Sequence, residues 1–236
     1  MSNNPDDRAA APVDTSWFRF YVDGAHVGWQ QLTRRIVAGA PGPGGSSEPP
    51  DQLLRREVLT VFHAGDSVHT SAFFAEAPEG DPLAWRRFGT LTPSDAGYVE
   101  GQVFRREGDQ LSMPDGSSTA LPPVCYPGQL LLELAMARLR SGQPSLEATP
   151  LHDGDGSLEA PTNLRVVPAL IGPPGVTHRF DELPTDGGPA RRSILLAPDG
   201  RPMRQVWGPG TWCGASLTRE QAQANGPAAP GLGPPD

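Results

Sequence analysis

The stretch FRFYVDGAHVGWQ, residues 18–30, places an Asp-Gly pair between two runs in which apolar and polar residues alternate. This arrangement is a strong β-hairpin signal, because a type I′ turn needs positive φ at both central residues and Asp-Gly tolerates it. With Asp23 and Gly24 as the turn residues, six apolar side chains share one face, which predicts a core face. The expected pairs are Val22 with Ala25, Phe20 with Val27, and Phe18 with Trp29.

The opposite face of this hairpin is polar and aromatic. It carries Trp17, Arg19, Tyr21, His26, Gly28 and Gln30. Such a mixture of rings, a guanidinium and an imidazole is typical of recognition, and Gly28 is expected to leave a hollow opposite Arg19. We therefore predict that Arg19, Tyr21, His26 and Gly28 bind a ligand. The alternative is a half-exposed edge hairpin, since isolated surface aromatics are common.

The composition bounds the class of protein. The chain has 236 residues with a formal charge of −8, and every basic residue is arginine. The absence of lysine excludes Schiff-base chemistry through lysine and a P-loop. An acidic chain without a basic block is a poor nucleic-acid binder. No apolar run is long enough to span a membrane, and the opening residues lack the features of a signal peptide, so we expect a cytoplasmic protein.

Glycine and proline, 28 of each, mark the expected domain organisation. They concentrate at the chain ends and in a few internal segments, which predicts a folded core with flexible connections. We expect a disordered tail at 1–15, a single β-dominated domain at 16–224 with a flexible loop at 38–52, and a disordered tail at 225–236.

Short runs rich in β-branched and aromatic residues follow one another without helices between them, which predicts an antiparallel sheet. A second Asp-Gly pair, Asp199-Gly200, predicts another hairpin, with Ile194 facing Gln205 and Leu196 facing Met203. The predicted strand segments are RREVLTVF (55–62), SVHTSAFFAEA (67–77), AWRRFGTLT (84–92), GYVEGQVFRREGDQLSMP (97–114), LRVVPALI (164–171), THRFDEL (177–183) and ARRSILLAPDGRPMRQVWG (190–208).

One strong helix interrupts this pattern in YPGQLLLELAMARLRSGQ, residues 126–143. Pro127 suits a first helical turn and Gly142 suits the position past the end. The leucines cover more than half of the helix circumference, so we expect the 126–140 helix to be buried on the concave side of the sheet. Near the C-terminus, Thr218 with Gln221 fits a capping box and predicts a short final helix.

The order of these elements resembles the LolA-like family of curved antiparallel sheets. The resemblance is carried by YVDGAHVGWQ near the start, LPP and YPGQLLLEL in the middle, and ILLAPDGRPMRQ followed by LTREQA at the end. It implies a half-barrel around an apolar cavity that is closed by helices and binds acyl chains or other apolar groups. The chain departs from the lipoprotein carriers of that family, which have a signal peptide and a lipid-attachment cysteine.

Catalytic and metal-binding motifs are weak. The histidines lack metal-ligand spacing, and we predict no metal and no cofactor. TWCGAS around Cys213 shares C-G-[SA] with papain-type nucleophiles but lacks the rest of that signature, so a small buried residue at a strand end is the simpler interpretation. HDGDGSLE, residues 152–159, has the wrong glycine position for a calcium loop and is interpreted as an acidic turn. We predict no catalytic residue. Cys125 and Cys213 are expected to be free and partly buried.

Five Arg-Arg pairs stand in or beside the predicted strands. Because successive strand residues point to opposite faces, each pair sends one guanidinium to each side of the sheet. One interpretation is a solvated rim that prevents edge aggregation. The other is that inward arginines, with Arg105 as our candidate, hold the head group of an amphipathic ligand. The pairs are 34–35, 55–56, 86–87, 105–106 and 191–192.

These observations lead to a β-dominated α+β fold: a strongly curved antiparallel sheet with one buried helix. The favoured function is non-catalytic binding of an apolar or amphipathic small molecule or protein partner in the concavity. The alternatives are a small enzyme that uses Tyr, His and Arg side chains of the concave face, and a purely structural interaction protein.

Overall fold

The computed structural model describes residues 14–38, 52–95, 97–170, 173–208, 210–216 and 218–224. The predicted tails at 1–15 and 225–236 and the predicted loop at 38–52 lie outside these ranges, except for residues 14, 15, 38 and 52. These four residues belong to strands: the first strand begins at Asp14, the second ends at Ala38 and the third begins at Gln52.

Within the described residues, fifteen strands form one sheet, which confirms the predicted β-dominated architecture. The spatial order is β8-β7-β6-β5-β4-β3-β2-β1-β15-β14-β13-β12-β11-β10-β9, so the pairing of β1 with β15 joins two halves. Neighbouring strands are antiparallel except β9 and β10, which are parallel. The strands are β1 (Asp14–Val22), β2 (Ala25–Ala38), β3 (Gln52–Ala64), β4 (Ser67–Pro78), β5 (Arg87–Ser94), β6 (Gly97–Glu107), β7 (Gln110–Ser112), β8 (Ser118–Ala120), β9 (Cys125–Pro127), β10 (Ser145–Leu151), β11 (Thr162–Pro168), β12 (His178–Pro184), β13 (Arg192–Leu196), β14 (Pro202–Trp207) and β15 (Thr211–Ser216).

The predicted central helix consists of a 3₁₀ turn, η2 (Gly128–Leu130), followed by α1 (Leu131–Ser141). Tyr126 and Pro127 were expected to be helical, but they belong to β9, where they pair with β10. Gly142 ends the helix with a φ of 65°, as predicted. Two short helical elements complete the described chain: η1 (Pro82–Ala84), and α2 (Arg219–Gln223), which has the predicted capping box.

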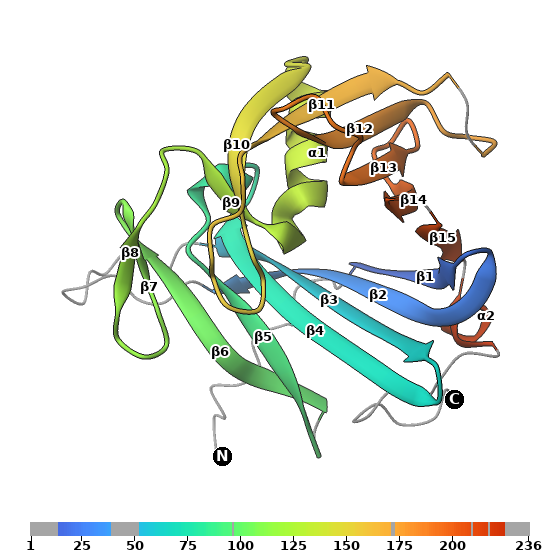
Figure 1. The fold of residues 1–236 in the computed structure, drawn as a ribbon, viewed down its shortest axis with the longest axis horizontal. Helices are drawn as coiled ribbons and strands as arrows, with labels where there is room; N and C mark the ends of the chain where they lie inside the picture. The colour runs from blue at the N-terminus through green and yellow to red at the C-terminus, as the bar shows by residue number, and fades with distance from the viewer. Residues whose placement is uncertain are drawn as a thin grey trace, which may run out of the picture.

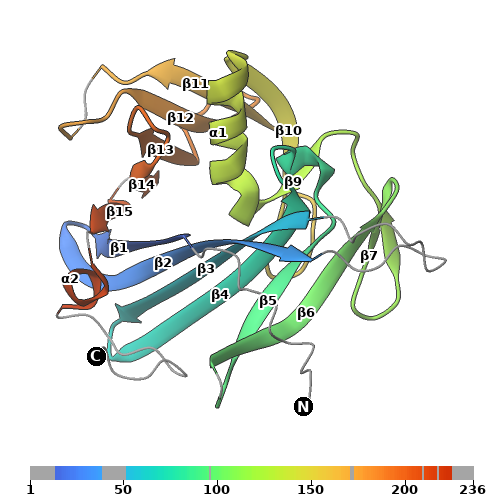
Figure 2. The ribbon, with the colours of Figure 1, turned by 180° about the vertical axis from the view of Figure 1, so that it is seen from behind.

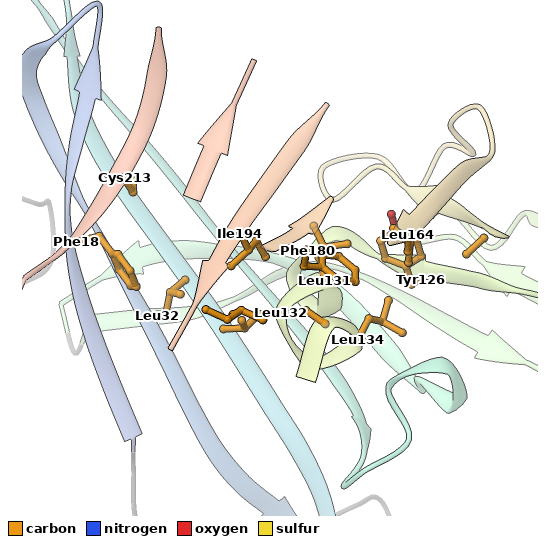
Figure 3. Packing of buried hydrophobic residues seen from close by; sticks show 13 residues of the cluster. Phe18, Leu32, Tyr126, Leu131, Leu132, Leu134, Leu164, Phe180, Ile194 and Cys213 are labelled. Carbon is orange, nitrogen blue, oxygen red and sulfur yellow. The ribbon is translucent and has the colours of Figure 1, made fainter. Parts of the chain in front are cut away.

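The sheet curves around α1, with β2–β4 on one side of the helix and β11–β13 on the other (Figures 1 and 2). Leu131, Leu132 and Leu134 of α1 are buried between the two halves, and Figure 3 shows them among side chains from both. Burial of a leucine side chain stabilises the fold by roughly 1.5–3 kcal/mol, so the helix is part of the core. The buried partners in this cluster include Phe18, Leu32, Leu164, Phe180, Ile194, Leu196 and Cys213.

The opening hairpin has the predicted turn. Asp23 and Gly24 have φ values of 49° and 81°, as a type I′ turn requires, and Val22 pairs with Ala25. The chain thus reverses where the Asp-Gly pair predicted it.

The predicted register of this hairpin is wrong beyond the turn. A bulge between Phe20 and Tyr21 shifts the pairing, so that Phe20 pairs with Gly28 and Phe18 with Gln30. Phe18 and Phe20 therefore face the concave core, whereas Trp29 packs in a separate cluster on the convex face. A bulge adds one residue to one strand and exchanges the faces that follow it, and here the exchange gives both sides of the sheet buried aromatic rings.

The predicted hollow at Gly28 is also wrong. A Cβ atom at this position would lie 2.1 Å from the backbone oxygen of Val61 and 2.6 Å from the Cα of Phe62. Glycine is needed at position 28 because the backbone of β3 approaches closely, and a side chain there would clash.

The second Asp-Gly pair lies in a longer connection, residues 197–201, between β13 and β14. Ile194 pairs with Gln205 as predicted, but a bulge at Leu196 pairs that residue with Pro202 in place of Met203. In both hairpins the glycine bends the chain as expected, while a bulge determines the register.

TWCGAS, residues 211–216, forms a strand of its own, whereas the sequence had placed Cys213 at the end of a strand. As β15 it pairs with both β1 and β14, and it joins the two halves of the sheet. Its side chains alternate as in any strand: Cys213 enters the concave core, while Trp212 stacks on Tyr21 with ring centroids 4.0 Å apart.

The convex face of the sheet has its own buried region. Trp29 and Val61 are fully buried there, next to Ala222 of α2. Beside them, Arg55 lies over the Phe74 ring, with the guanidinium carbon 4.2 Å from the ring centroid. Packing and ion pairs hold this face together, and it also has a space of about 240 Å³ that is lined by Arg35, Glu57 and Tyr98 among others.

Candidate functional site

A cavity of about 300 Å³ lies on the concave side of the sheet, beside the first turns of the central helix. We refer to it as the concave cavity. Its size is at the lower end of the range for small-molecule sites, roughly 300–1,000 Å³. It is lined by Phe20, Gln30, Leu32, Arg56, Val58, Thr60, Phe62, Ser71, Phe73, Gly128, Gln129, Leu131, Leu132, Asp153, Arg192, Ile194, Gln205, Trp207 and Thr211.

Aromatic rings form much of the apolar wall of the concave cavity. The Phe20 ring lies 5.5 Å from the Phe62 ring and 5.9 Å from the Trp207 ring, measured between centroids. These three rings come from β1, β3 and β14, so both halves of the sheet contribute. The bulge in the opening hairpin is what directs Phe20 into this wall.

A chain of buried polar side chains crosses the concave cavity. The Gln30 amide nitrogen donates to the Thr60 hydroxyl at 3.0 Å, and the Gln205 amide nitrogen donates to the Gln30 oxygen at 3.2 Å. This network ties β14 to β2 and β3, and it gives an otherwise apolar wall a polar strip.

Asp153 stands where the concave cavity meets a second space of about 270 Å³, which we call the side pocket. Its carboxylate accepts a hydrogen bond from the backbone N–H of Gly128 at 2.8 Å. Burial raises the pKa of Asp153 to about 6, against the opposing effects of Arg192, the Gly128 N–H and the Gln129 side chain. A carboxyl group that titrates near neutral pH is thus placed beside an apolar cavity.

Arg192 also lines both spaces and leads into a buried polar cluster. Its Nε donates to Glu182 at 3.3 Å, and the other carboxylate oxygen of Glu182 accepts from the Tyr126 hydroxyl at 2.8 Å. Burial and the Glu182 carboxylate raise the pKa of Tyr126 well above its usual range, so the hydroxyl stays protonated and donates.

Arg56 and Glu133 form an ion pair at the other end of the concave cavity, and Arg34 lies 3.9 Å from the same carboxylate. Arg56 borders an outer pocket that opens toward Arg140 and Arg201. Even so, the Nε of Arg56 is buried without a hydrogen-bond partner among the described residues.

The same is true of the Gln129 side-chain oxygen, which is buried and has no partner in the described part of the chain. The amide nitrogen of Gln129 interacts with Asp153, which leaves the oxygen as a spare acceptor. Gln129 is 6% exposed and Arg56 is 7% exposed, and both side chains line the concave cavity. Buried polar atoms without a partner are uncommon in folded proteins and call for an explanation.

The residues predicted to bind a ligand lie elsewhere. The structure does bring Tyr21, His26 and Gly28 close together: the Tyr21 and His26 rings are 5.4 Å apart, and a ring nitrogen of His26 lies 2.8 Å from the Gly28 carbonyl oxygen. Arg19 donates to the Gln221 carbonyl of α2 at 2.8 Å, beyond the convex face. Arg105 is exposed on β6. None of the five lines the concave cavity, and their role in binding stays a prediction.

The arrangement of the arginine pairs agrees with the strand geometry. Arg34 and Arg56 contact Glu133 of α1 on the concave side, whereas Arg35 and Arg55 contact Glu57 on the convex side. The inward arginines therefore exist, but the residues at the cavity are Arg56 and Arg192 and not Arg105.

Sequence reasoning missed Asp153, because it treated HDGDGSLE as an acidic turn. Asp155 does stabilise that turn, since its carboxylate accepts from the backbone N–H of Ser157 at 2.9 Å. The neighbouring Asp153 instead reaches the start of the helix, 25 residues earlier in the chain. An Asp adjacent to a turn carries no signal for this long-range contact.

Cys125 and Cys213 are free and buried, and burial raises the pKa of both thiols. A thiol in such a setting is a poor nucleophile. In the described ranges, no group of three or more His, Cys, Asp or Glu side chains could hold a metal ion. Nor does any described helix have the length and apolar character needed to cross a membrane.

Comparisons with known proteins give little guidance. No family model matches the chain, and no curated protein matches it. A solved structure of a DUF1329 family protein from Desulfovibrio piger aligns with 92% of this chain and 91% of its own, at 8% identity and a TM-score of 0.22. That similarity is too weak to support an argument about fold or function, and the resemblance to the LolA-like family stays a prediction.

Proposed function

We propose that this protein binds a small amphipathic molecule in the concave cavity, with the apolar part against Phe20, Phe62 and Trp207 and the polar part toward Asp153. The observation that carries the proposal is the coexistence, in one cavity, of an aromatic wall and buried polar atoms that lack partners. Binding sites for small molecules combine apolar walls with a few convergent polar groups in this way.

The balance of the lining supports an amphipathic ligand over a purely apolar one. A dry apolar cavity accepts hydrocarbon alone, but this cavity also contains the Gln30–Thr60–Gln205 network and borders Asp153. Displacing water from these groups without replacing its hydrogen bonds is unfavourable. A ligand with a polar group at one end satisfies both parts of the lining.

The test uses a matched pair of variants on β4. Ser71 lines the concave cavity, and its neighbour Thr70 is exposed on the opposite face of the same strand. Ser71→Trp is expected to fill the cavity, and Thr70→Trp to leave it open. We expect fluorescence titration with the neutral probe N-phenyl-1-naphthylamine to show binding by the wild type and Thr70→Trp, and at least a tenfold loss for Ser71→Trp. Equal binding by all three proteins would place the probe outside the cavity.

A further inference from the structure

We infer that the polar end of the concave cavity selects a cationic head group, an alkylammonium, with Asp153 as its counter-ion. This inference rests on the proposed function and names the ligand class of the same site. It follows from the pairing of charges around Asp153 and from the spare acceptor on Gln129.

The two arginines of the side pocket each form an ion pair with a glutamate, and the Asp153 carboxylate is left without one. Arg191 lies 3.4 Å from Glu159, and Arg192 lies 3.3 Å from Glu182. Asp153 forms no ion pair with any arginine or histidine of the described chain. With three carboxylates and two guanidinium groups, this end of the cavity has one negative charge in excess.

The Gln129 oxygen is an independent sign of a ligand that donates hydrogen bonds. It is a buried acceptor without a partner, on a side chain that lines the concave cavity and whose amide nitrogen interacts with Asp153. An ammonium group has three N–H donors and can serve the Asp153 carboxylate and the Gln129 oxygen together. A carboxylate or phosphate head group offers only acceptors to these two atoms.

The arginines of the cavity do not reverse this preference. Arg192 forms an ion pair with Glu182 and also interacts electrostatically with Asp153. Arg56 forms an ion pair with Glu133 at the end of the cavity that adjoins the outer pocket. An anionic ligand has to compete with these carboxylates, whereas a cationic ligand supplies Asp153 and the Gln129 oxygen and leaves the Arg56 Nε as it is. A buried charge without a partner of opposite sign is unfavourable.

The inference carries a pH dependence with a definite sign. The groups that face Asp153 are Arg192, the Gly128 N–H, the Gln129 side chain and His152, whose ring is bonded to Asp155. Because the pKa of Asp153 is about 6, its carboxylate is charged above that pH and neutral below it. An alkylamine stays protonated until about pH 10. Its affinity should therefore be high between about pH 6 and 10 and fall as the pH drops through 6.

The experiment compares three ligands with the same chain: octylamine, 1-octanol and octanoate, each displacing N-phenyl-1-naphthylamine from the full-length protein. At pH 7.5 we expect octylamine to bind most tightly and octanoate most weakly. Lowering the pH to 5 should weaken octylamine binding about tenfold, because a carboxyl group with a pKa near 6 is then mostly protonated and uncharged. Octanol should change little.

Two variants separate the roles of neighbouring carboxylates. Asp153→Asn should weaken octylamine at least tenfold at pH 7.5 and leave octanol within about threefold. Asp155→Asn, in the same turn but outside both cavities, should leave every affinity unchanged. If octanol or octanoate binds the wild type as tightly as octylamine, or if Asp153→Asn keeps its octylamine affinity, the head-group inference is wrong and the cavity remains a binding site. If neither the probe nor any octyl compound binds, both proposals fail.

Discussion

The two faces of the central strands both bury charged side chains, and each face has two buried polar atoms without a hydrogen-bond partner among the described residues. On the convex face these are the Nε atoms of Arg35 and Arg204, and on the concave face they are the Arg56 Nε and the Gln129 oxygen. On the convex face, Arg55 bonds Glu57 and Glu76, and Arg87 bonds Glu76 and Glu100. On the concave face, Arg56 pairs with Glu133 and Arg192 pairs with Glu182, whereas Asp153 forms no ion pair with a described residue.

This difference distinguishes a structural network from a binding site. A complete network of ion pairs holds strands in register and needs nothing further. The concave face differs in having a cavity with a wall of Phe20, Phe62 and Trp207 and, beside it, the Asp153 carboxylate, which forms no ion pair with a described residue. The charge balance on the two faces thus bears on function, although both faces contain the same types of residue.

The largest effect is expected from breaking the convex network. Arg55→Met leaves Glu57, Glu76 and Glu100 without one of their partners, and Glu76 is 2% exposed. Removal of one member of a buried ion pair destabilises a protein by about 3–5 kcal/mol. The control is Arg105→Met, an exposed arginine on β6, with an expected change within about 0.5 kcal/mol. Urea unfolding measures both. Equal stability of the two variants would show that the network is not structural.

The concave core is tested by Leu134→Ala. Leu134 is fully buried between α1 and the sheet, and truncation of a buried leucine lowers the free energy of unfolding by about 2–5 kcal/mol. Leu139→Ala, at a partly buried position of the same helix, should lower it by less. A change below about 0.5 kcal/mol for Leu134→Ala would remove the helix from the core.

Asp153→Asn is expected to raise stability, in contrast to the convex variant. The folded pKa of Asp153 is about 6 and its ordinary value is 3.8, so the folded state holds the proton more tightly than the unfolded state. Wild-type stability therefore falls as the pH rises from about 4 to 6, and the loss is complete above 6. The variant lacks this loss and should gain on the order of 1–3 kcal/mol at pH 7.5.

Thermal unfolding across the pH range checks this sign. The advantage of Asp153→Asn over the wild type should shrink as the pH falls below 6 and vanish near pH 4. An advantage that is constant with pH, or a less stable variant, would mean that Asp153 carries no unfavourable charge.

Gly24→Val is expected to give the smallest stability change, and it tests the turn between β1 and β2. Gly24 has a φ of 81°, and no heavy atom lies within 4 Å of a Cβ placed there. The loss is therefore backbone strain alone, about 1–2 kcal/mol. An unchanged melting temperature would contradict the turn geometry.

Local signals predicted the features that depend on local chemistry. The Asp23-Gly24 turn, the helix end at Gly142 and the Thr218 capping box each involve a few neighbouring residues, and each is present. The alternation of Arg55 and Arg56 across the sheet also follows from strand geometry.

Long-range features could not be predicted in the same way. The bulge between Phe20 and Tyr21 depends on what each face of β1 buries, namely the helix on one side and α2 on the other. Asp153 gains its role only because β10 brings its turn beside Gly128. The predicted grouping of Gly28 with Tyr21 and His26 on one face rested on a regular register, but the bulge pairs Gly28 with Phe20, while Tyr21 and His26 still pair as predicted.

The most direct test of the central claim locates a bound ligand by tryptophan quenching. Trp207 lines the concave cavity, whereas Trp212 stacks on Tyr21, beside the residues that the sequence favoured. We would titrate 8-bromooctan-1-ol, whose bromine quenches indole fluorescence on contact, into the wild type, Trp207→Phe and Trp212→Phe. Ligand binding in the concave cavity predicts that saturable quenching is lost in Trp207→Phe and kept in Trp212→Phe. The reverse result would contradict the cavity and favour the site around Tyr21 and His26.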